Sequence, residues 1–259
     1  MDSVAYLGMS GALQTARAQQ VNLNNLANVD TPAFKADFTS AQPVIIDAEG
    51  LASRAWAAEG KTGTDLSMGA VRATGRALDV TLPAGVWMAV QSRATYVNDG
   101  AEEYYTRRAD FQIDAEGYLT NGAGNRVLDE NGQWMSVVNA QKILFSEEGI
   151  VSLVPMGASM ETQVVVGRLK LIQPNPADLQ KSPEGLFLLK KEAVLPLSGT
   201  DGHNLPPLQV GFLEGSNVNP VMELMELLRL SRHHELNFKF IEAARHQDEV
   251  SAAVLRFSY

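Results

Sequence analysis

Cysteine is absent from this 259-residue sequence, and long apolar runs are absent as well. Without cysteine, the chain can form no disulfide bond, catalytic thiolate or cysteine-ligated metal site. The longest apolar stretches, such as residues 164–166 and 186–189, are far shorter than the roughly 20 residues that a membrane-spanning helix needs. The first residues contain neither a basic stretch nor an unbroken apolar segment, so we expect no cleaved signal peptide.

Basic side chains are in the minority. The sequence contains 21 Lys and Arg against 30 Asp and Glu, and its formal net charge is −9. Proteins that bind nucleic acids in general need a basic face that neutralises phosphates. We therefore expect no nucleic-acid partner, and the lack of a long apolar run predicts no direct membrane insertion.

Motifs for catalysis or metal binding are incomplete wherever they begin. His233-His234-Glu235 lacks the second histidine of a zinc-binding helix, because position 238 is Phe. The glycine-rich residues 121–124 lie between predicted strands and not at the start of a helix that could bind phosphate. Residues 129–132 lack the spacing of a calcium loop. We therefore predict that the protein is not an enzyme and has no catalytic residue, cofactor or metal.

An amphipathic pattern near the N-terminus predicts a helix over residues 3–28. Its apolar and small positions recur at alternating intervals of three and four residues, which is typical of a coiled-coil seam. Asp30-Thr31-Pro32 ends the helix, because the residue before proline disfavours the helical conformation. The seam consists of Tyr6, Met9, Leu13, Ala16, Gln20, Leu23 and Ala27.

The same helix is nearly free of charge. Between Ser3 and Asn28 the only charged residue is Arg17, and the polar positions are mostly amides and hydroxyls. Solvated helix faces usually carry Lys and Glu, whereas neutral amides cost less to desolvate than charges. This composition favours burial against other subunits. The alternative is an ordinary amphipathic helix that packs on its own domain.

The middle of the chain has two parts. Residues 39–75 are rich in Ala, Gly, Ser and Thr, and we interpret them as an extended connector that can include short strands. Residues 76–212 alternate short apolar runs with turn signals such as Asp114-Ala115-Glu116-Gly117, which predicts a mostly antiparallel β domain.

A long C-terminal helix is predicted over residues 219–256. Asn217 or Asn219 can cap it and Pro220 suits its first turn. Roughly 38 residues at about 1.5 Å each give about 57 Å, more than the N-terminal helix can cover, so part of its apolar stripe needs another partner. The stripe consists of Val221, Leu224, Met225, Leu228, Leu236, Phe240, Ala243, Val250, Val254 and Phe257.

We therefore predict an α+β fold, in which the N- and C-terminal helices form a coiled-coil-like helical layer and the middle of the chain forms a mostly antiparallel β domain. The expected divisions are an N-terminal helix over 1–38, the connector over 39–75, the β domain over 76–212 and the long helix over 213–259.

Three segments give the sequence a resemblance to the axial proteins of the bacterial flagellar rod and hook. They lie at the end of the first helix, at the start of the β domain and at the start of the last helix. They are Asn24-Asn25-Leu26-Ala27-Asn28 with Thr31, Phe34 and Lys35; Leu78-Asp79-Val80 with residues 105–119; and residues 213–220 with Glu223, Arg232, Glu235 and Lys239. Ala33 and Ala109 replace glycines that are usual in the family, and alanine would be disfavoured if the turn at Ala33 needs a positive φ.

The resemblance implies a structural subunit of the flagellar basal-body rod, of the proximal-rod type. Such a protein leaves through the flagellar type III export apparatus, reaches the periplasm, and assembles with its own copies and neighbouring rod proteins into a helical tube that transmits torque. The expected interface residues are Leu13, Leu23, Asn24, Asn25, Leu26, Asn28, Thr31, Phe34, Ser216, Asn217, Val218, Glu223, Leu228, Arg232, Glu235, Phe240, Val250, Val254 and Phe257.

Two alternatives stay open at this point. One is a distal rod or hook-type member of the same family. The other, from a different class, is a secreted β-domain adhesin or binding module whose helical ends anchor it. Association through the termini would indicate a rod protein, and binding of a ligand through the middle would indicate an adhesin.

Overall fold

The computed structural model describes residues 2–45, 55–96, 102–157, 162–190 and 206–256. The chain divides into two compact units. The first, which we call the helical unit, comprises Met1–Val29, Ala36–Asp65 and Val218–Tyr259. The second, the β unit, comprises Asp30–Lys35 and Leu66–Asn217.

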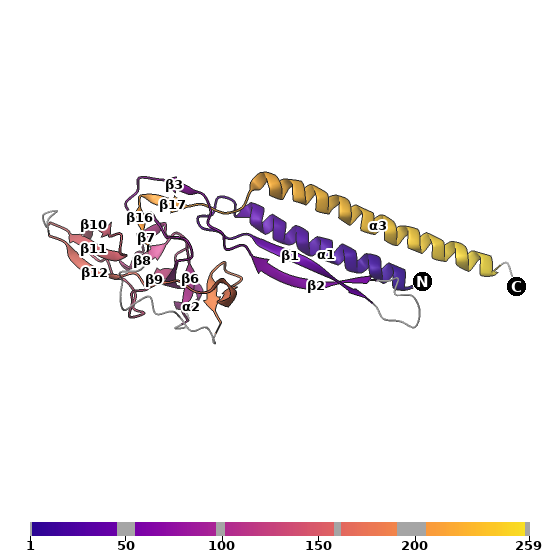
Figure 1. Cartoon of the computed structure of the whole chain (residues 1–259), viewed down its shortest axis with the longest axis horizontal. Coiled ribbons are helices and arrows are strands. Elements are labelled where there is room, and N and C mark those ends of the chain that lie inside the picture. The colour runs from indigo at the N-terminus through magenta and orange to yellow at the C-terminus, as the bar shows by residue number, and fades with distance from the viewer. Residues whose placement is uncertain (1, 46–54, 97–101, 158–161, 191–205, 257–259) are drawn as a thin grey trace. The chain divides into compact units, whose positions relative to one another are not determined.

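The helical unit contains two helices and one β-hairpin. Helix α1 spans Asp2–Ala27 and helix α3 spans Pro220–Arg256, so both predicted helices are confirmed to within a residue at each end. Figure 1 shows the two helices side by side. They run antiparallel, because the end of α1 contacts the start of α3. The Asn219 side chain caps α3, since its Oδ1 accepts from the amides of Val221 at 3.1 Å and Met222 at 3.3 Å.

The hairpin replaces most of the expected connector. Strand β1, Asp37–Ile45, pairs antiparallel with β2, Ala55–Thr64, and both strands contact α1. The structure thus places residues 37–45 and 55–64 in regular strands of the helical unit, where the sequence predicted an extended connector over 39–75. Alanine, glycine and threonine give these strands no clear apolar alternation, so the pattern did not reveal them.

Small residues let α1 lie close to α3. A Cβ added to Gly8 would lie 2.7 Å from Cγ1 of Ile241, and one added to Gly11 would lie 3.1 Å from Oδ1 of Asn237. Asn237 also donates to the hydroxyl of Thr15 at 3.2 Å. The face of α1 that meets α3 is therefore small and polar.

The β unit is built from short strands, and every pairing between its described strands is antiparallel. Its largest sheet has the order β14-β15-β6-β5-β9-β8-β7, with β13 also paired to β5; β10-β11-β12 form a second sheet, and the pairs β16–β4 and β17–β3 complete the unit. The elements are β3 Val71–Ala73, β4 Val80–Thr81, β5 Trp87–Gln91, α2 Arg93–Tyr96, β6 Tyr104–Thr106, β7 Phe111–Ile113, β8 Leu119–Asn121, β9 Arg126–Val127, β10 Ala140–Phe145, β11 Ile150–Pro155, β12 Val164–Arg168, β13 Leu171–Ile172, η1 Pro176–Asp178, β14 Leu179–Lys181, β15 Phe187–Leu189, β16 Gln209–Val210 and β17 Phe212–Glu214.

The β unit has its own apolar core. Leu82, Met88, Val90, Phe111 and Leu119 are fully buried there, and the ring of Phe111 stacks on that of Phe145 at 4.9 Å between centroids. The predicted turn over residues 114–117 ends in Gly117, which has a positive φ, and Gly132 and Gly149 also have a positive φ. An α+β fold with a mostly antiparallel β domain is thus confirmed.

Ala33 adopts a left-handed backbone conformation, with a φ of 54°. It is buried, and its amide donates to the carbonyl of Glu214 at 2.9 Å. An L-residue in this conformation costs roughly 1–2 kcal/mol. The substitution of alanine for the usual glycine therefore introduces local strain.

We expect Ala33→Gly to stabilise the β unit. Relief of the strain exceeds the roughly 0.5–1 kcal/mol of extra chain freedom that glycine loses on folding. The net gain should be about 0.5 kcal/mol in the free energy of unfolding, measured by denaturant titration. Ala77→Gly is the matched control, because Ala77 is exposed and has an ordinary φ; it should lower stability. A loss of stability in Ala33→Gly would contradict the strain.

Candidate assembly interface

The apolar seam predicted on α1 is exposed. The exposed fractions of Tyr6, Met9, Leu13 and Leu23 are 62%, 62%, 56% and 50%. Ala16, Gln20 and Ala27 on the same seam are exposed too. Because α3 packs against the face that carries Gly8 and Gly11, this seam has no covering element among the described residues.

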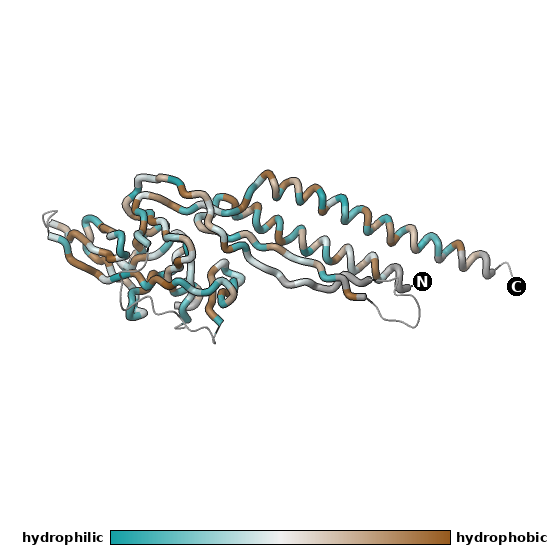
Figure 2. Tube along the Cα trace, viewed as in Figure 1, coloured by the Kyte–Doolittle hydropathy of each residue, from teal (hydrophilic) through white to brown (hydrophobic). Residues whose placement is uncertain are grey.

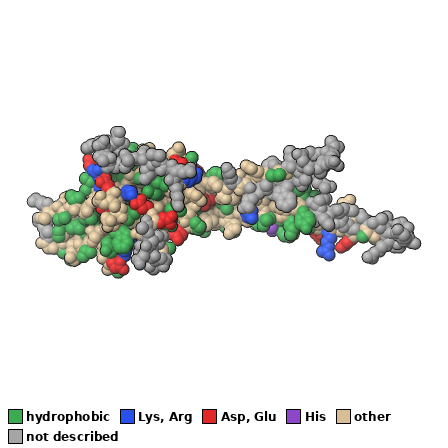
Figure 3. Space-filling view, turned by 90° about the horizontal axis from the view of Figure 1, so that it is seen from below, with side chains coloured by type: hydrophobic (Ala, Val, Ile, Leu, Met, Phe, Trp, Pro, Cys, Tyr) green, Lys and Arg blue, Asp and Glu red, His purple; other side chains and the backbone are tan. Residues whose placement is uncertain are grey.

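Helix α3 carries a second exposed apolar surface at its start. Val221, Met222, Leu224, Met225 and Leu228 are between 48% and 63% exposed. Apolar positions continue along both helices in Figure 2, and Figure 3 shows hydrophobic side chains at the surface. Contiguous exposed apolar residues on a folded protein mark a site of association. Further along α3, four more large apolar residues are exposed: Leu236, Phe238, Phe240 and Val250.

Among the predicted interface residues, Asn25 lies inside the helical unit. Its side chain is 3% exposed and exchanges two hydrogen bonds with the backbone of Asp37, one to the carbonyl at 2.8 Å and one from the amide at 2.9 Å. It also donates to Oε1 of Glu223 at 3.4 Å. The side-chain amide of Asn25 thus pairs with the backbone of Asp37 as a peptide group would. It links α1 to the start of β1 and to α3.

The other predicted residues of the terminal helices differ in exposure. Asn24, Arg232 and Glu235 are exposed, whereas Leu26 and Asn28 are half-buried. Asn28 donates to the carbonyl of Asn24 at 2.9 Å, which is a local contact at the end of the helix. The pairing of Arg232 with Glu235 that their spacing allows is not formed, and such exposed pairs contribute little. The side chain of Val254 and all of Phe257 lie outside the described residues.

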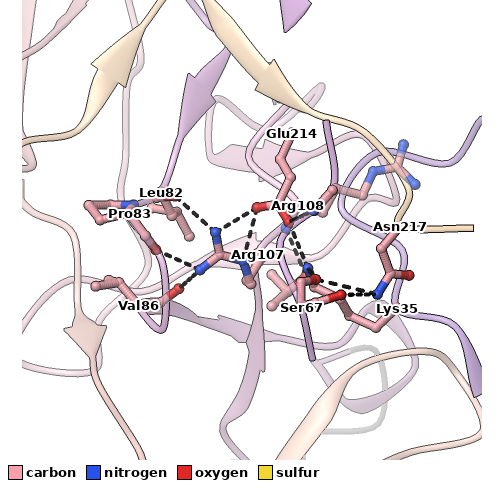
Figure 4. Close-up of polar contacts among 11 residues, drawn as sticks. Lys35, Ser67, Leu82, Pro83, Val86, Arg107, Arg108, Glu214 and Asn217 are labelled. Carbon is pink, nitrogen blue, oxygen red and sulfur yellow. Dashed lines mark hydrogen bonds and ion pairs between the residues drawn. The ribbon is translucent and has the colours of Figure 1, made fainter. Parts of the chain in front are cut away.

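In the β unit, a buried carboxylate holds the segments that flank the terminal helices (Figure 4). Glu214 is 1% exposed and Lys35 is 1% exposed. Oε1 of Glu214 accepts from Nζ of Lys35 at 2.6 Å and from the amide of Gly69 at 3.1 Å. Lys35 also donates to the carbonyl of Ser67 at 2.6 Å. A single carboxylate therefore joins residues far apart in the sequence.

Arg107 completes this charge cluster. Its Nε and Nη2 donate to Oε2 of Glu214 at 2.9 and 2.6 Å, which is a forked contact. Its remaining protons go to three carbonyls, of Leu82 at 2.9 Å, Pro83 at 2.7 Å and Val86 at 2.6 Å. The cluster contains two cations and one anion, and the carbonyl oxygens compensate for the excess positive charge.

The remaining predicted interface residues surround this cluster. The amide of Asn217 donates to the carbonyl of Phe34 at 3.3 Å, and its side chain donates to Ser67. The ammonium of Lys181 lies 4.3 Å from the centre of the Phe34 ring. Thr31 and Ser216 are half-buried in the β unit, and Val218 is buried in the helical unit.

The charge cluster was not predicted from the sequence. Lys35, Arg107 and Glu214 all lie in the motif segments, but their separation in the sequence hides their pairing. The available signal was a glutamate in an otherwise apolar strand, between Leu213 and Gly215, because buried carboxylates need a partner.

The described residues contain no group of His, Asp and Glu that could hold a metal ion. None of their helices is long and apolar enough to cross a membrane. The buried polar side chains described above, such as Asn25 and Glu214, form hydrogen bonds between elements within their own unit.

Two helices that expose apolar surfaces, in a chain with an antiparallel β unit, define a structural subunit that associates. Residues 209–252 match the model of the family described as flagellar basal body rod FlgEFG protein C-terminal. Over 93% of both chains, the sequence is 34% identical to the flagellar basal-body rod protein FlgF of Salmonella typhimurium. FlgF of Escherichia coli is 34% identical over 94% of both chains, and the rod protein FlgG of Bacillus subtilis is 28% identical over 91% of this chain and 92% of its own.

The chain belongs to the family of flagellar basal-body rod proteins. It is a structural subunit of the rod in the flagellar basal body, and it is more like the FlgF relatives named above than the FlgG relative. The predicted resemblance to this family, and to its FlgF type, is confirmed.

The charge cluster predicts unequal effects of neutralising its members. Glu214→Gln leaves Lys35 and Arg107 buried together without a counter-charge, and should cost about 3–5 kcal/mol. Lys35→Met leaves the neutral pair of Arg107 and Glu214, so about 1–3 kcal/mol is expected for the lost hydrogen bonds. Denaturant unfolding of the full chain measures both.

Glu148→Gln is the control for these two variants, because Glu148 lies 3.7 Å from Arg168 in a largely exposed pair. It should change stability by less than about 1 kcal/mol. If Lys35→Met were the more damaging variant, the assignment of Glu214 as the centre of the cluster would be wrong.

Glu223 predicts a pH dependence of the helical unit. Partial burial raises its pKa above the ordinary 4.5, repulsion from Glu226 adds to the rise, and the hydrogen bond from Asn25 opposes it. Because folding raises the pKa of Glu223, its protonated carboxyl stabilises the helical unit below pH 4.5. This contribution is lost as the pH rises through the pKa of the folded state.

The stability of the wild type relative to Glu223→Gln should therefore fall as the pH rises from 4.5 through the pKa of Glu223 in the folded state. Unfolding titrations of both proteins at several pH values measure the difference. Parallel curves for the two proteins would contradict the raised pKa.

Proposed function

We propose that this rod subunit assembles with copies of itself and with neighbouring rod proteins into a helical tube that transmits torque from the motor to the hook. The observation that carries the proposal is the exposed apolar seam of α1 together with the exposed apolar start of α3. A soluble monomer gains nothing from these surfaces, whereas a polymer buries them.

A helical tube is built from contacts between unlike surfaces that do not close into a small ring. The helical unit offers two unlike surfaces. One is the nearly uncharged seam of α1, and the other is the methionine-rich start of α3, where Met222 and Met225 are 63% and 62% exposed. Each subunit can therefore use one surface for each neighbour.

In the assembled tube, the terminal helices would form a coiled-coil-like inner layer. Support comes from the spacing of the α1 seam, which alternates three and four residues. The β unit would form an outer layer. Its buried charge cluster holds the segments next to both terminal helices, which suits a part that resists mechanical load.

The role is structural, with no catalysis, cofactor or nucleic acid. We further propose that the protein passes through the flagellar type III export apparatus and assembles in the periplasm. The absence of cysteine supports this route, because the chain can fold in an oxidising compartment without forming unwanted disulfides.

Leu13→Gln combined with Leu23→Gln tests the seam. Both side chains are already half or more exposed, so the free energy of unfolding of the monomer should change by less than about 0.5 kcal/mol per site. Rod assembly should fail, because the two amides would have to be desolvated in the interface. Swimming assays and electron microscopy of isolated basal bodies in a deletion strain measure the outcome.

Ile113→Gln is the matched control, since Ile113 is 46% exposed on a strand of the β unit. It should leave swimming and the rod unchanged. A strain with the doubly substituted seam that swims normally and has complete rods would refute the proposal, as would an intact rod in the strain that lacks the protein.

A further inference from the structure

The helical unit contains a groove of about 520 Å³ that lies along α1 and is lined by α1, β1 and α3. Ala18 and Val21 of α1, Phe38 of β1 and Leu230 of α3 provide its apolar lining. The face of α1 in this groove is not the exposed seam, since none of the seam residues lines it. The groove is therefore a separate surface of the same unit.

The groove contains a buried acceptor without a donor. Asn22 is 4% exposed, and its Nδ2 donates to the carboxylate of Glu223 and to the carbonyl of the same residue at 3.1 Å. Its Oδ1 is buried and has no hydrogen-bond partner among the described residues. A buried carbonyl oxygen without a partner is unfavourable, so a donor that reaches this atom would stabilise the unit.

The carboxylates of the groove add further acceptors. Glu223 accepts only from the amides of Asn22 and Asn25, and no cation forms an ion pair with it among the described residues. Glu226 pairs with Arg229 at 2.7 Å, and Asp37 also lines the groove. Three carboxylates thus face one arginine and His233. The raised pKa of Glu223 agrees with a desolvated anion that lacks a cation.

We propose that this groove binds a guanidinium from α3 of a second copy of the chain, and that the residue is Arg232. The inference rests on the proposed function, because it names the contact that two assembled copies make. A guanidinium presents several donors in one plane, so it can bind a carboxylate oxygen and an amide oxygen together. Glu223 and Oδ1 of Asn22 offer this pair.

Arg232 fits this role better than Arg245 and Lys239 of the same helix. It is exposed and makes no hydrogen bond or ion pair with any described residue. Arg245 is paired with Glu249 at 3.5 Å, and Lys239 offers a point charge without the planar fork. Leu228 lies one turn before Arg232 on the same face of α3, so it would enter the apolar part of the groove beside the guanidinium.

Engineered cysteines test the contact, because the chain has no cysteine of its own. Ala18→Cys in the groove combined with Leu228→Cys should form a disulfide between two copies when basal bodies are oxidised. The product would migrate as a dimer on a non-reducing gel. Ala16→Cys combined with Leu228→Cys is the control pair, since Ala16 lies on the exposed seam of α1.

Arg232→Gln in the background of the first cysteine pair should lower the yield of the dimer about tenfold or more, because a charge-assisted contact is lost. Lys239→Gln in the same background should leave the yield unchanged. Circular dichroism of the purified variants checks that the exposed substitutions leave the fold intact.

A dimer from the Ala16 pair and not from the Ala18 pair would overturn the inference, and so would normal rods with no dimer from either pair. Both of these results leave the proposed function standing. Failure of the cysteine-free parent to restore the rod in a deletion strain would instead overturn the proposed function and the inference with it.

Discussion

Within the β unit, the positions of its first and last segments depend on the buried carboxylate of Glu214. It binds Lys35, just before β1, and Arg107, in the body of the unit, while its own backbone carbonyl accepts from Ala33. A buried ion cluster of this kind is weak evidence for stability, because its charges are costly to desolvate, but its hydrogen bonds join Lys35, Gly69 and Arg107 to one carboxylate. The segments that follow α1 and precede α3 in the sequence therefore have defined positions within the β unit. Ala33 is strained in this arrangement.

The asparagines of the helical unit have a comparable effect. The side chain of Asn25 pairs with the backbone of Asp37 as a peptide group would, and Asn22 and Asn25 both donate to the carboxylate of Glu223. Polar groups buried between helices specify register more than they add stability. The small and polar face of α1 thus sets where α3 lies, and the apolar face of α1 is left for other contacts.

Local signals in the sequence predicted the helices and turns well. Pro32 and Asn219 marked the ends of the helices, and glycines with positive φ marked the turns. The hairpin β1–β2 was not predicted, because its pairing depends on contacts between strands and with α1 and not on apolar alternation. The periodicity identified the apolar seam of α1, and the nearly charge-free composition of the helix predicted contacts with other subunits, which agrees with the exposure of Leu13 and Leu23. The partners of Glu214 lie 107 and 179 residues away, beyond any local pattern.

The exposure of that seam has an energetic consequence. Burying a large apolar side chain contributes about 1.5–3 kcal/mol, and Tyr6, Met9, Leu13 and Leu23 are each at least half exposed. The helical unit therefore folds without the stabilisation that burial of these side chains would contribute. Association with a neighbour recovers it, minus the entropy lost on assembly. A subunit built in this way is less stable alone than in a polymer, so folding and assembly of its terminal helices are thermodynamically coupled.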